Sequence, residues 1–288
     1  MSGAVKLAVS NIAWAPDEAE AACALLAAHG ATGLEIAPGL AFADQDDRLR
    51  PSAGAIAALK QRLDHFGLAL VSMQSLLFGV SGAQLFGSAE ERERLEQGLY
   101  RAIDLAERLE LPNLVFGSPG NRAYPGSMTE GEALDAAAHV FRRLGDRARA
   151  AGTRLAIEPN PAVYGTNFLT TVDDAARFVA ALGHDGITLN YDIGALITNG
   201  EVPQAGALYD QAGARVSHVH ISEPGLAAAP ADSQGLASIV ASLEQRGYAG
   251  WYSIEMRAPP TGALDQLKRS LASASAAFSE AMKGSGHA

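Results

Sequence analysis

The chain has 288 residues, of which 48% are hydrophobic and 19% are charged, a balance typical of a globular protein with a large buried core. Its formal net charge of −10 argues against a nucleic-acid-binding surface, which needs clustered Lys and Arg, and no segment reaches the roughly 20 apolar residues of a membrane helix. We therefore expect a cytoplasmic protein that binds neither nucleic acid nor a membrane.

Eight short apolar segments of strand length alternate with longer helical patterns along the chain. Their Val, Ile, Leu and aromatic residues are typical of strands that are covered on both faces. The expected strands are 6–11, 33–37, 68–74, 113–118, 154–160, 187–193, 215–222 and 251–256.

Helical patterns fill the intervals between these strands. They include 17–29, 53–66, 89–109, 129–151 and 171–182, and 203–214 is the weakest of them. The expected N-caps are Ser52, Ser88, Thr129 and Asp232 or Ser233. The one cysteine, Cys23, lies in an Ala-rich helical stretch, where we expect a small buried residue.

Eight strands that are each followed by a helix predict a (β/α)₈ TIM barrel. A doubly wound sheet usually carries a Gly-rich phosphate loop after its first strand, and the residues that follow the first strand here contain no glycine. Residues 1–280 are predicted to form a single barrel domain, and 281–288 a flexible C-terminal tail.

The last four strands each end in a polar residue that the alternation of side chains places on the inward face: Glu158, Asp192, His220 and Glu255. Their spacings of 34, 28 and 35 residues each fit one strand–helix repeat. Active sites of such barrels lie at the C-terminal ends of the strands. Because unpaired buried charges cost several kcal/mol, the convergence of three carboxylates and an imidazole predicts a bound divalent metal.

Four motifs carry a family resemblance: Ile157-Glu158-Pro159-Asn160, Asn190-Tyr191-Asp192-Ile193-Gly194, His218-Val219-His220-Ile221-Ser222-Glu223 and Ser253-Ile254-Glu255. With their strand order, they resemble the sugar phosphate isomerase/epimerase family of the xylose isomerase-like TIM barrel superfamily. That group includes ketose 3-epimerases, inosose dehydratases, hydroxypyruvate isomerases and, more distantly, endonuclease IV.

The resemblance implies one metal ion held by Glu158, Asp192, His220 and Glu255. It also implies that Glu158 and Glu255 move protons on opposite faces of the substrate. An oxygen-rich ligand set favours Mn²⁺, with Mg²⁺, Co²⁺ and Zn²⁺ as alternatives. Relatives often form homo-oligomers, which makes a homo-oligomer an expectation here.

Two positions depart from the epimerase pattern. Epimerases usually carry a histidine where this chain has Ala195, and an arginine where it has Leu226. Both family residues contact the substrate near its reacting carbons. Their replacement leaves the metal ligands in place but argues against a 3-epimerase of free ketoses.

Other polar residues lie in the loops after the strands and are predicted substrate contacts. They are Gln74, Asn121, Arg122, Asn160, Tyr164, Glu223 and Arg257. Glu35 is interpreted either as another pocket acid or as a partner for a buried cation, and His218 as a buried histidine behind the metal ligands.

These features predict a metal-dependent isomerase or epimerase of a sugar or sugar derivative, which acts through a metal-stabilised enediolate with two glutamates as acid and base. A dehydratase or β-eliminating lyase on a keto-sugar or keto-cyclitol is the alternative. A non-catalytic sugar-binding barrel is a third hypothesis. An endonuclease IV-like phosphodiesterase is disfavoured by the net charge of −10 and by having only seven histidines.

Overall fold

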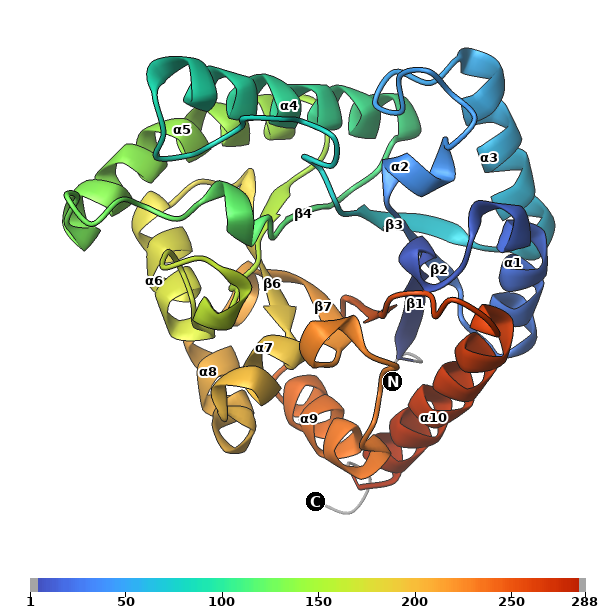
Figure 1. Ribbon diagram of the computed structural model, residues 1–288. Helices are drawn as coiled ribbons and strands as arrows, with labels where there is room; N and C mark the ends of the chain where they lie inside the picture. Colours follow the sequence, from blue (N-terminus) through green and yellow to red (C-terminus); the bar gives the residue numbers. More distant parts are fainter. Residues whose placement is uncertain (1–4, 285–288) are drawn as a thin grey trace.

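The eight predicted strands all form, and they close into one parallel barrel in sequence order, with β8 paired to β1 (Figure 1). The computed structural model describes residues 5–284. The strands are β1 (Lys6–Ser10), β2 (Gly33–Ile36), β3 (Ala69–Met73), β4 (Leu114–Phe116), β5 (Leu155–Ile157), β6 (Ile187–Asp192), β7 (Val216–Ser222) and β8 (Trp251–Glu255). The predicted TIM barrel is therefore confirmed.

Helices surround the barrel on its outside, as Figure 1 shows. They are α1 (Ala19–Ala28), α2 (Pro38–Ala41), α3 (Ala53–Phe66), α4 (Ala89–Leu109), α5 (Glu130–Ala150), α6 (Val172–Leu182), α7 (Ile193–Asn199), α8 (Ala205–Ala212), α9 (Ser233–Gln245) and α10 (Ala263–Gly284). Short 3-10 turns are η1 (Asn11–Ala13), η2 (Pro16–Glu18), η3 (Pro119–Asn121), η4 (Ala162–Tyr164), η5 (Val202–Gln204), η6 (Gly213–Arg215) and η7 (Pro224–Leu226). None of the helices in the described part of the chain combines the length and the apolar character needed to cross a membrane.

Side-chain caps fix the starts of the long helices where the sequence predicts them. The Ser88 hydroxyl accepts a hydrogen bond from the Glu91 amide at 3.3 Å, and the Glu91 carboxylate accepts one from the Ser88 amide at 2.7 Å. Thr129 begins α5 in the same way, and Asp232 caps α9. Such caps satisfy amides that the first helical turn leaves unpaired.

The C-terminal helix extends further than expected. α10 continues through residues 281–284 of the predicted tail, because Ala281 is buried against the core together with Phe278. The rest of that tail, 285–288, lies outside the described residues.

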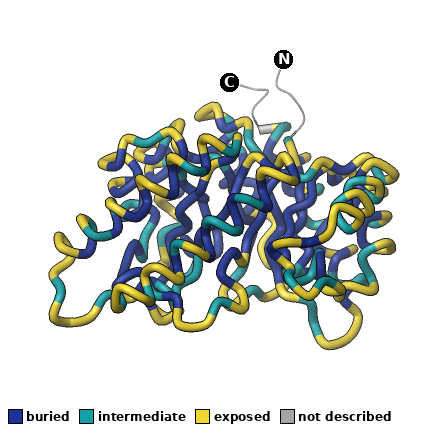
Figure 2. The backbone as a smooth tube through the Cα atoms, turned by 90° about the horizontal axis from the view of Figure 1, so that it is seen from above, coloured by how far each residue is buried: buried dark blue, intermediate teal, exposed yellow. Residues whose placement is uncertain are grey.

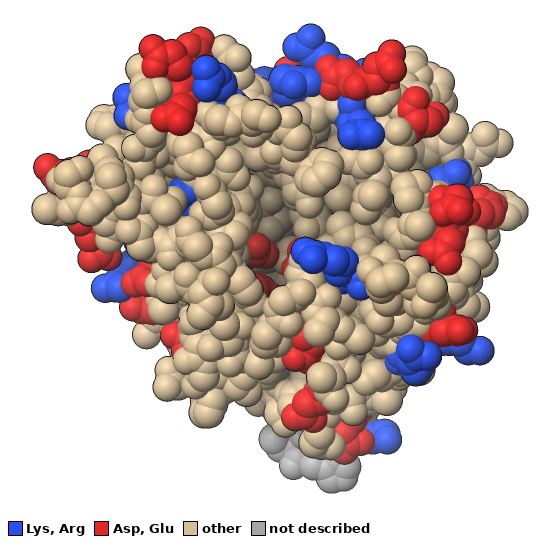
Figure 3. Space-filling model, viewed as in Figure 1, with Lys and Arg blue, Asp and Glu red and all other residues tan. Residues whose placement is uncertain are grey.

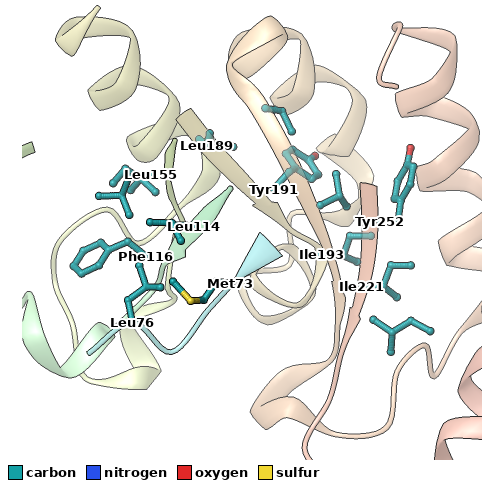
Figure 4. Packing of buried hydrophobic residues seen from close by; sticks show 14 of the residues in the cluster. Met73, Leu76, Leu114, Phe116, Leu155, Leu189, Tyr191, Ile193, Ile221 and Tyr252 are labelled. Atoms are coloured by element: carbon teal, nitrogen blue, oxygen red, sulfur yellow. The ribbon is translucent and has the colours of Figure 1, made fainter. Parts of the chain in front are cut away.

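The main apolar core lies between the barrel and the helices. The ring of Phe141 on α5 packs edge-on against Phe116 on β4, with centroids 5.4 Å apart, and against Phe178 on α6 at 5.7 Å. Figure 4 shows part of this layer, and Figure 2 shows the buried strands enclosed by helices with exposed outer faces. Burial of these side chains provides the main stabilisation of the fold.

The interior of the barrel is polar by comparison. Asn113 donates to the hydroxyl of Ser72 at 3.1 Å and accepts from that of Ser217 at 2.8 Å, and Ser217 also hydrogen-bonds Thr188 at 2.7 Å. This network joins β3, β6, β7 and the residue before β4, beneath the strand ends that the sequence predicts as a site.

Candidate metal centre

The four predicted metal ligands converge at the C-terminal ends of neighbouring strands. The parallel pairing places Asp192 beside His220, and Glu255 beside Ser222, two residues after His220. Glu158 follows β5 directly. Glu158, Asp192 and Glu255 line a cavity of about 560 Å³, whose mouth is the hollow with acidic atoms in Figure 3.

Three of these residues form one compact group around His220. Its Nδ1 lies 2.8 Å from Oε1 of Glu158 and 3.3 Å from Oε2 of Glu255. One potential ligand atom from each residue lies within 4.8 Å of the others, and all three residues are buried. The geometry is therefore that of a group that could hold a metal ion.

Asp192 lies at the same cavity but is turned toward α7. Its carboxylate accepts hydrogen bonds from the amides of Gly194 at 3.1 Å and Ala195 at 3.2 Å, and also one from the hydroxyl of Ser222. Asp192 is thus the N-cap of α7. The charges of the other three predicted ligands still affect its pKa.

The carboxylates repel one another without a cation. Burial, followed by the charges of Glu158 and Glu255, raises the pKa of Asp192 to about 7. Burial also raises the pKa of Glu255. At Glu158 burial again acts to raise the pKa, but the hydrogen bond and charge of His220, together with Asn160 and Arg122, outweigh it and lower the pKa. Although burial opposes a charged imidazole, Glu35 and Glu255 raise the pKa of His220 well above its ordinary value.

Amide and guanidinium groups hold Glu158 in place. Asn190 donates to its Oε1 at 2.7 Å and Asn160 to its Oε2 at 3.1 Å. Arg122 donates from Nη2 to the backbone oxygen of Glu158 at 2.7 Å. Gly117 leaves space for the carboxylate, since a Cβ at this position would collide with Oε2 of Glu158.

A divalent cation fits this donor set. Three buried carboxylates and one imidazole nitrogen are the ligands that Mn²⁺ and similar ions accept. The charges of Glu158 and Glu255 add to burial in raising the pKa of Asp192, and a bound cation would offset this accumulation of negative charge. Glu158, Asp192, His220 and Glu255 are the residues that would hold the ion.

The predicted substrate contacts fall into two groups. Six of the seven line the cavity: Gln74, Asn121, Asn160, Tyr164, Glu223 and Arg257. The side chain of Arg122 does not line it, because it is fully buried and stacks 5.8 Å from the ring centroid of Phe116. Burial lowers the pKa of Arg122 to about 10, against the opposing charge of Glu158.

Several of the lining side chains already have protein partners. Gln74 donates to the Ser10 hydroxyl at 2.7 Å, and Asn121 donates to the backbone oxygen of Ala83 at 2.7 Å. Arg257 is the basic residue among those that line the cavity. Within residues 5–284 its exposed guanidinium has no hydrogen-bond or ion-pair partner.

Some residues of the site were not predicted. Asn190 and Ser222 lie two residues before Asp192 and two after His220, so the alternation that found the ligands could also have found them. Phe78, which is 72% exposed, lines the cavity from a loop where no periodic pattern predicts it. Glu35 is buried against His220, which supports its interpretation as the partner of a buried cationic group rather than as a cavity acid.

Solved structures of sugar epimerases share this fold. The chain is similar to a 3-keto-D-glucoside 4-epimerase from E. coli, with a TM-score of 0.74 and 18% identity over 93% of this chain and 98% of that one. It is similar to an L-ribulose 3-epimerase, with a TM-score of 0.78 and 18% identity over 97% and 96% of the two chains. A D-psicose 3-epimerase gives a TM-score of 0.76 and 15% identity over 98% and 100%.

No curated protein sequence matches the chain. A family model does, over residues 23–275, and its description is a xylose isomerase-like TIM barrel. The match begins within α1 and ends within α10, so it leaves out β1 but contains the four strand-end residues. The chain belongs to the xylose isomerase-like TIM barrel family.

Proposed function

We propose that this protein is a divalent-metal-dependent epimerase or isomerase of a sugar or sugar derivative. The observation that carries the proposal is the pair of glutamates, from β5 and β8, that approach one imidazole nitrogen at 2.8 and 3.3 Å and face one cavity. The similarity of the fold to three sugar epimerases supports the same class of reaction.

The two glutamates are the proposed acid and base. Glu158 follows β5 and Glu255 ends β8, and β6 and β7 lie between these strands in the barrel. We therefore expect the two carboxylates to approach a substrate from different directions. One would remove the proton next to the carbonyl, and the other would return a proton to the opposite face. When bound, a divalent cation would polarise the carbonyl and stabilise the enediolate. We propose Mn²⁺ as this ion.

The cavity lining suits hydroxyl groups. Amide side chains of Gln74, Asn121 and Asn160 and the hydroxyl of Tyr164 lie around it. Arg257 is placed to bind a hydroxyl or an anionic group, and its amide donates to the Leu226 oxygen at 2.9 Å. Arg257 therefore lies next to Leu226, one of the two positions where the chain departs from the epimerase pattern.

We also propose that the protein is cytoplasmic and forms a homo-oligomer, as the sequence predicts.

Elimination of water is the second candidate reaction. It is favoured by the apolar residues at the two departing positions: Ala195 is fully buried, and Leu226 lines the cavity. The same proton abstraction next to a carbonyl would then expel a β-leaving group. Loss of water from the product distinguishes this reaction from epimerisation, which leaves the molecular formula unchanged.

Incorporation of solvent deuterium tests the proposal. Keto- and aldo-sugars are incubated with the Mn²⁺-loaded protein in D₂O, and the recovered sugars are examined by mass spectrometry. We expect incorporation with at least one sugar, and a loss of at least about 100-fold in Glu158→Gln and in Glu255→Gln. Glu244→Gln is the control, because Glu244 does not line the cavity and its carboxylate accepts a hydrogen bond from the Tyr252 hydroxyl at 3.1 Å. Sugar binding without incorporation would contradict the proposal and indicate a non-catalytic barrel.

A further inference from the structure

A fourth carboxylate lies beneath the candidate metal centre, inside the barrel. Glu35 is fully buried on β2, where its neighbours in register are Ser10 on β1 and Ser72 on β3. Barrel interiors are usually filled with branched apolar side chains. A buried carboxylate costs several kcal/mol unless other groups compensate its charge, so its retention here calls for a function.

The contacts of Glu35 point to a single side chain of the metal centre. Nε2 of His220 lies 3.1 Å from both carboxylate oxygens. The hydroxyl of Ser253 donates to Oε2 at 3.0 Å. Nε2 of His218 lies 3.6 Å from Oε1, too far for a hydrogen bond.

His220 is therefore held from both sides. Its Nδ1 faces Glu158 and Glu255 in the cavity, and its Nε2 faces Glu35 in the barrel. An imidazole binds a metal ion through an unprotonated nitrogen, and the hydrogen bond at the other nitrogen determines which one that is. The ring of His218, edge-on with its centroid 5.3 Å away, further restricts the orientation of His220.

We propose that Glu35 is a positioning residue of the metal centre, which accepts a hydrogen bond from Nε2–H of His220 and so keeps Nδ1 free to bind the ion. This inference rests on the metal site of the proposed function but not on the identity of the sugar or on the reaction. Glu35 does not line the cavity, so it acts on the metal only through His220.

A second metal ion between Glu35, His218 and His220 is the competing interpretation. Their potential ligand atoms also lie within 4.8 Å of one another. However, Glu35 and His218 are 0% and 1% exposed, and both lie behind His220, away from the cavity lining. A second ion would also require His220 to bind metal through both nitrogens. A positioning role needs neither an entry path nor a doubly deprotonated imidazole.

Metal affinity and histidine NMR test the proposal without any substrate. The affinity for Mn²⁺ is measured from the electron paramagnetic resonance signal of free Mn²⁺ in wild type, Glu35→Gln, Glu35→Asp and the Glu244→Gln control. We expect Glu35→Gln to bind Mn²⁺ about 10- to 100-fold more weakly, since this is the usual effect of removing a partner of a metal-binding histidine. Glu35→Asp, which keeps the carboxylate, should lose less, and Glu244→Gln should match wild type.

The tautomer of His220 is the readout that a merely structural role would not change. The protein is labelled with ¹⁵N-histidine and loaded with Mg²⁺, and the signal of His220 is identified because it is absent from the spectrum of His220→Gln. In wild type we expect His220 to carry its proton on Nε2. In Glu35→Gln we expect a mixture of the two tautomers. Unchanged affinity in Glu35→Gln, or a proton on Nδ1 in wild type, would overturn the proposal. Two bound ions per wild-type chain, of which Glu35→Gln loses one, would instead establish the second metal site. Failure to find an exchanging sugar would contradict only the proposed function.

Discussion

Two buried regions of this protein are built from opposite kinds of side chains. Between the barrel and the helices, phenylalanine rings such as Phe116, Phe141 and Phe178 pack edge-on with centroids less than 6 Å apart. Inside the barrel, the buried groups at the strand ends are carboxylates and imidazoles, with Glu35 and His220 fully buried. The first region gains free energy from burial, whereas the second loses it unless a cation is present.

This difference separates stability from function in the fold. The outer layer contributes mainly to the stability of the barrel, whereas the inner group contributes mainly to ligand binding. Substitutions in the two regions should therefore have opposite consequences for folding and for metal binding.

The largest effect on stability is expected in the outer layer. Phe141→Ala removes a fully buried ring that contacts both Phe116 and Phe178. We expect its free energy of unfolding, measured by urea denaturation, to fall by about 3–5 kcal/mol, while Mn²⁺ affinity of the folded protein stays unchanged. If folded Phe141→Ala, at urea concentrations below its unfolding transition, bound Mn²⁺ much more weakly than wild type, the two regions would not be independent.

Cys23 reports on the same outer layer. It is 2% exposed on α1, and burial raises the pKa of its thiol to about 11. Because the thiolate is the reactive form, the folded protein at pH 8 should react with iodoacetamide at least about 100-fold more slowly than the urea-unfolded chain. The rate should rise with pH as the thiol ionises. Equal rates for folded and unfolded protein would mean that α1 opens readily.

A smaller, local effect is expected where the inner group meets the backbone. Gly117→Ala places a methyl group against Oε2 of Glu158 and 3.4 Å from Oδ1 of Asn160. We expect Mn²⁺ to bind about 10-fold more weakly, because the displaced Glu158 no longer faces His220 correctly. Gly120→Ala is the matched control, since a Cβ at Gly120 meets nothing within 4 Å. Identical affinities for the two variants would contradict this role of Gly117.

The smallest effect is expected from neutralising one charge of the inner group in the metal-free protein. Burial raises the pKa of Glu255, so its ionised form disfavours folding at pH values above the unfolded pKa. Glu255→Gln without metal should therefore be at least as stable as wild type at pH 7. The difference should disappear near pH 3, below the ordinary glutamate pKa of about 4.3, where Glu255 is protonated in both the folded and the unfolded wild-type chain. A loss at pH 7 as large as that of Phe141→Ala would contradict the contrast between the regions.

Much of this structure is predictable from sequence because two simple periodicities determine it. Apolar strands that alternate with capped helices predict the barrel, and the period of two along a strand predicts that His220 and Glu255 point inward. The end of α10 was harder to place, because Gly284 and its polar neighbours are typical of a tail, whereas the helix continues to Gly284 and Ala281 packs on the core.

Side-chain contacts between distant strands were harder to predict. Glu35 lies 185 residues from His220 in the chain, and only closure of the barrel brings the two together. Arg122 was expected at the substrate, but its loop turns the side chain beneath Glu158, where it donates to the backbone. Neither arrangement follows from spacing within one strand.

Metal content measured by inductively coupled plasma mass spectrometry tests the central claim most directly. The protein is stripped with EDTA, incubated with equal concentrations of Mn²⁺, Mg²⁺, Co²⁺ and Zn²⁺, and dialysed. We predict one bound divalent ion, Mn²⁺, per wild-type chain, and no retained ion in the Glu158→Gln/Glu255→Gln double variant. Wild-type protein that retains no ion, or a double variant that retains as much as wild type, would contradict the claim that this group of strand-end residues is a metal centre.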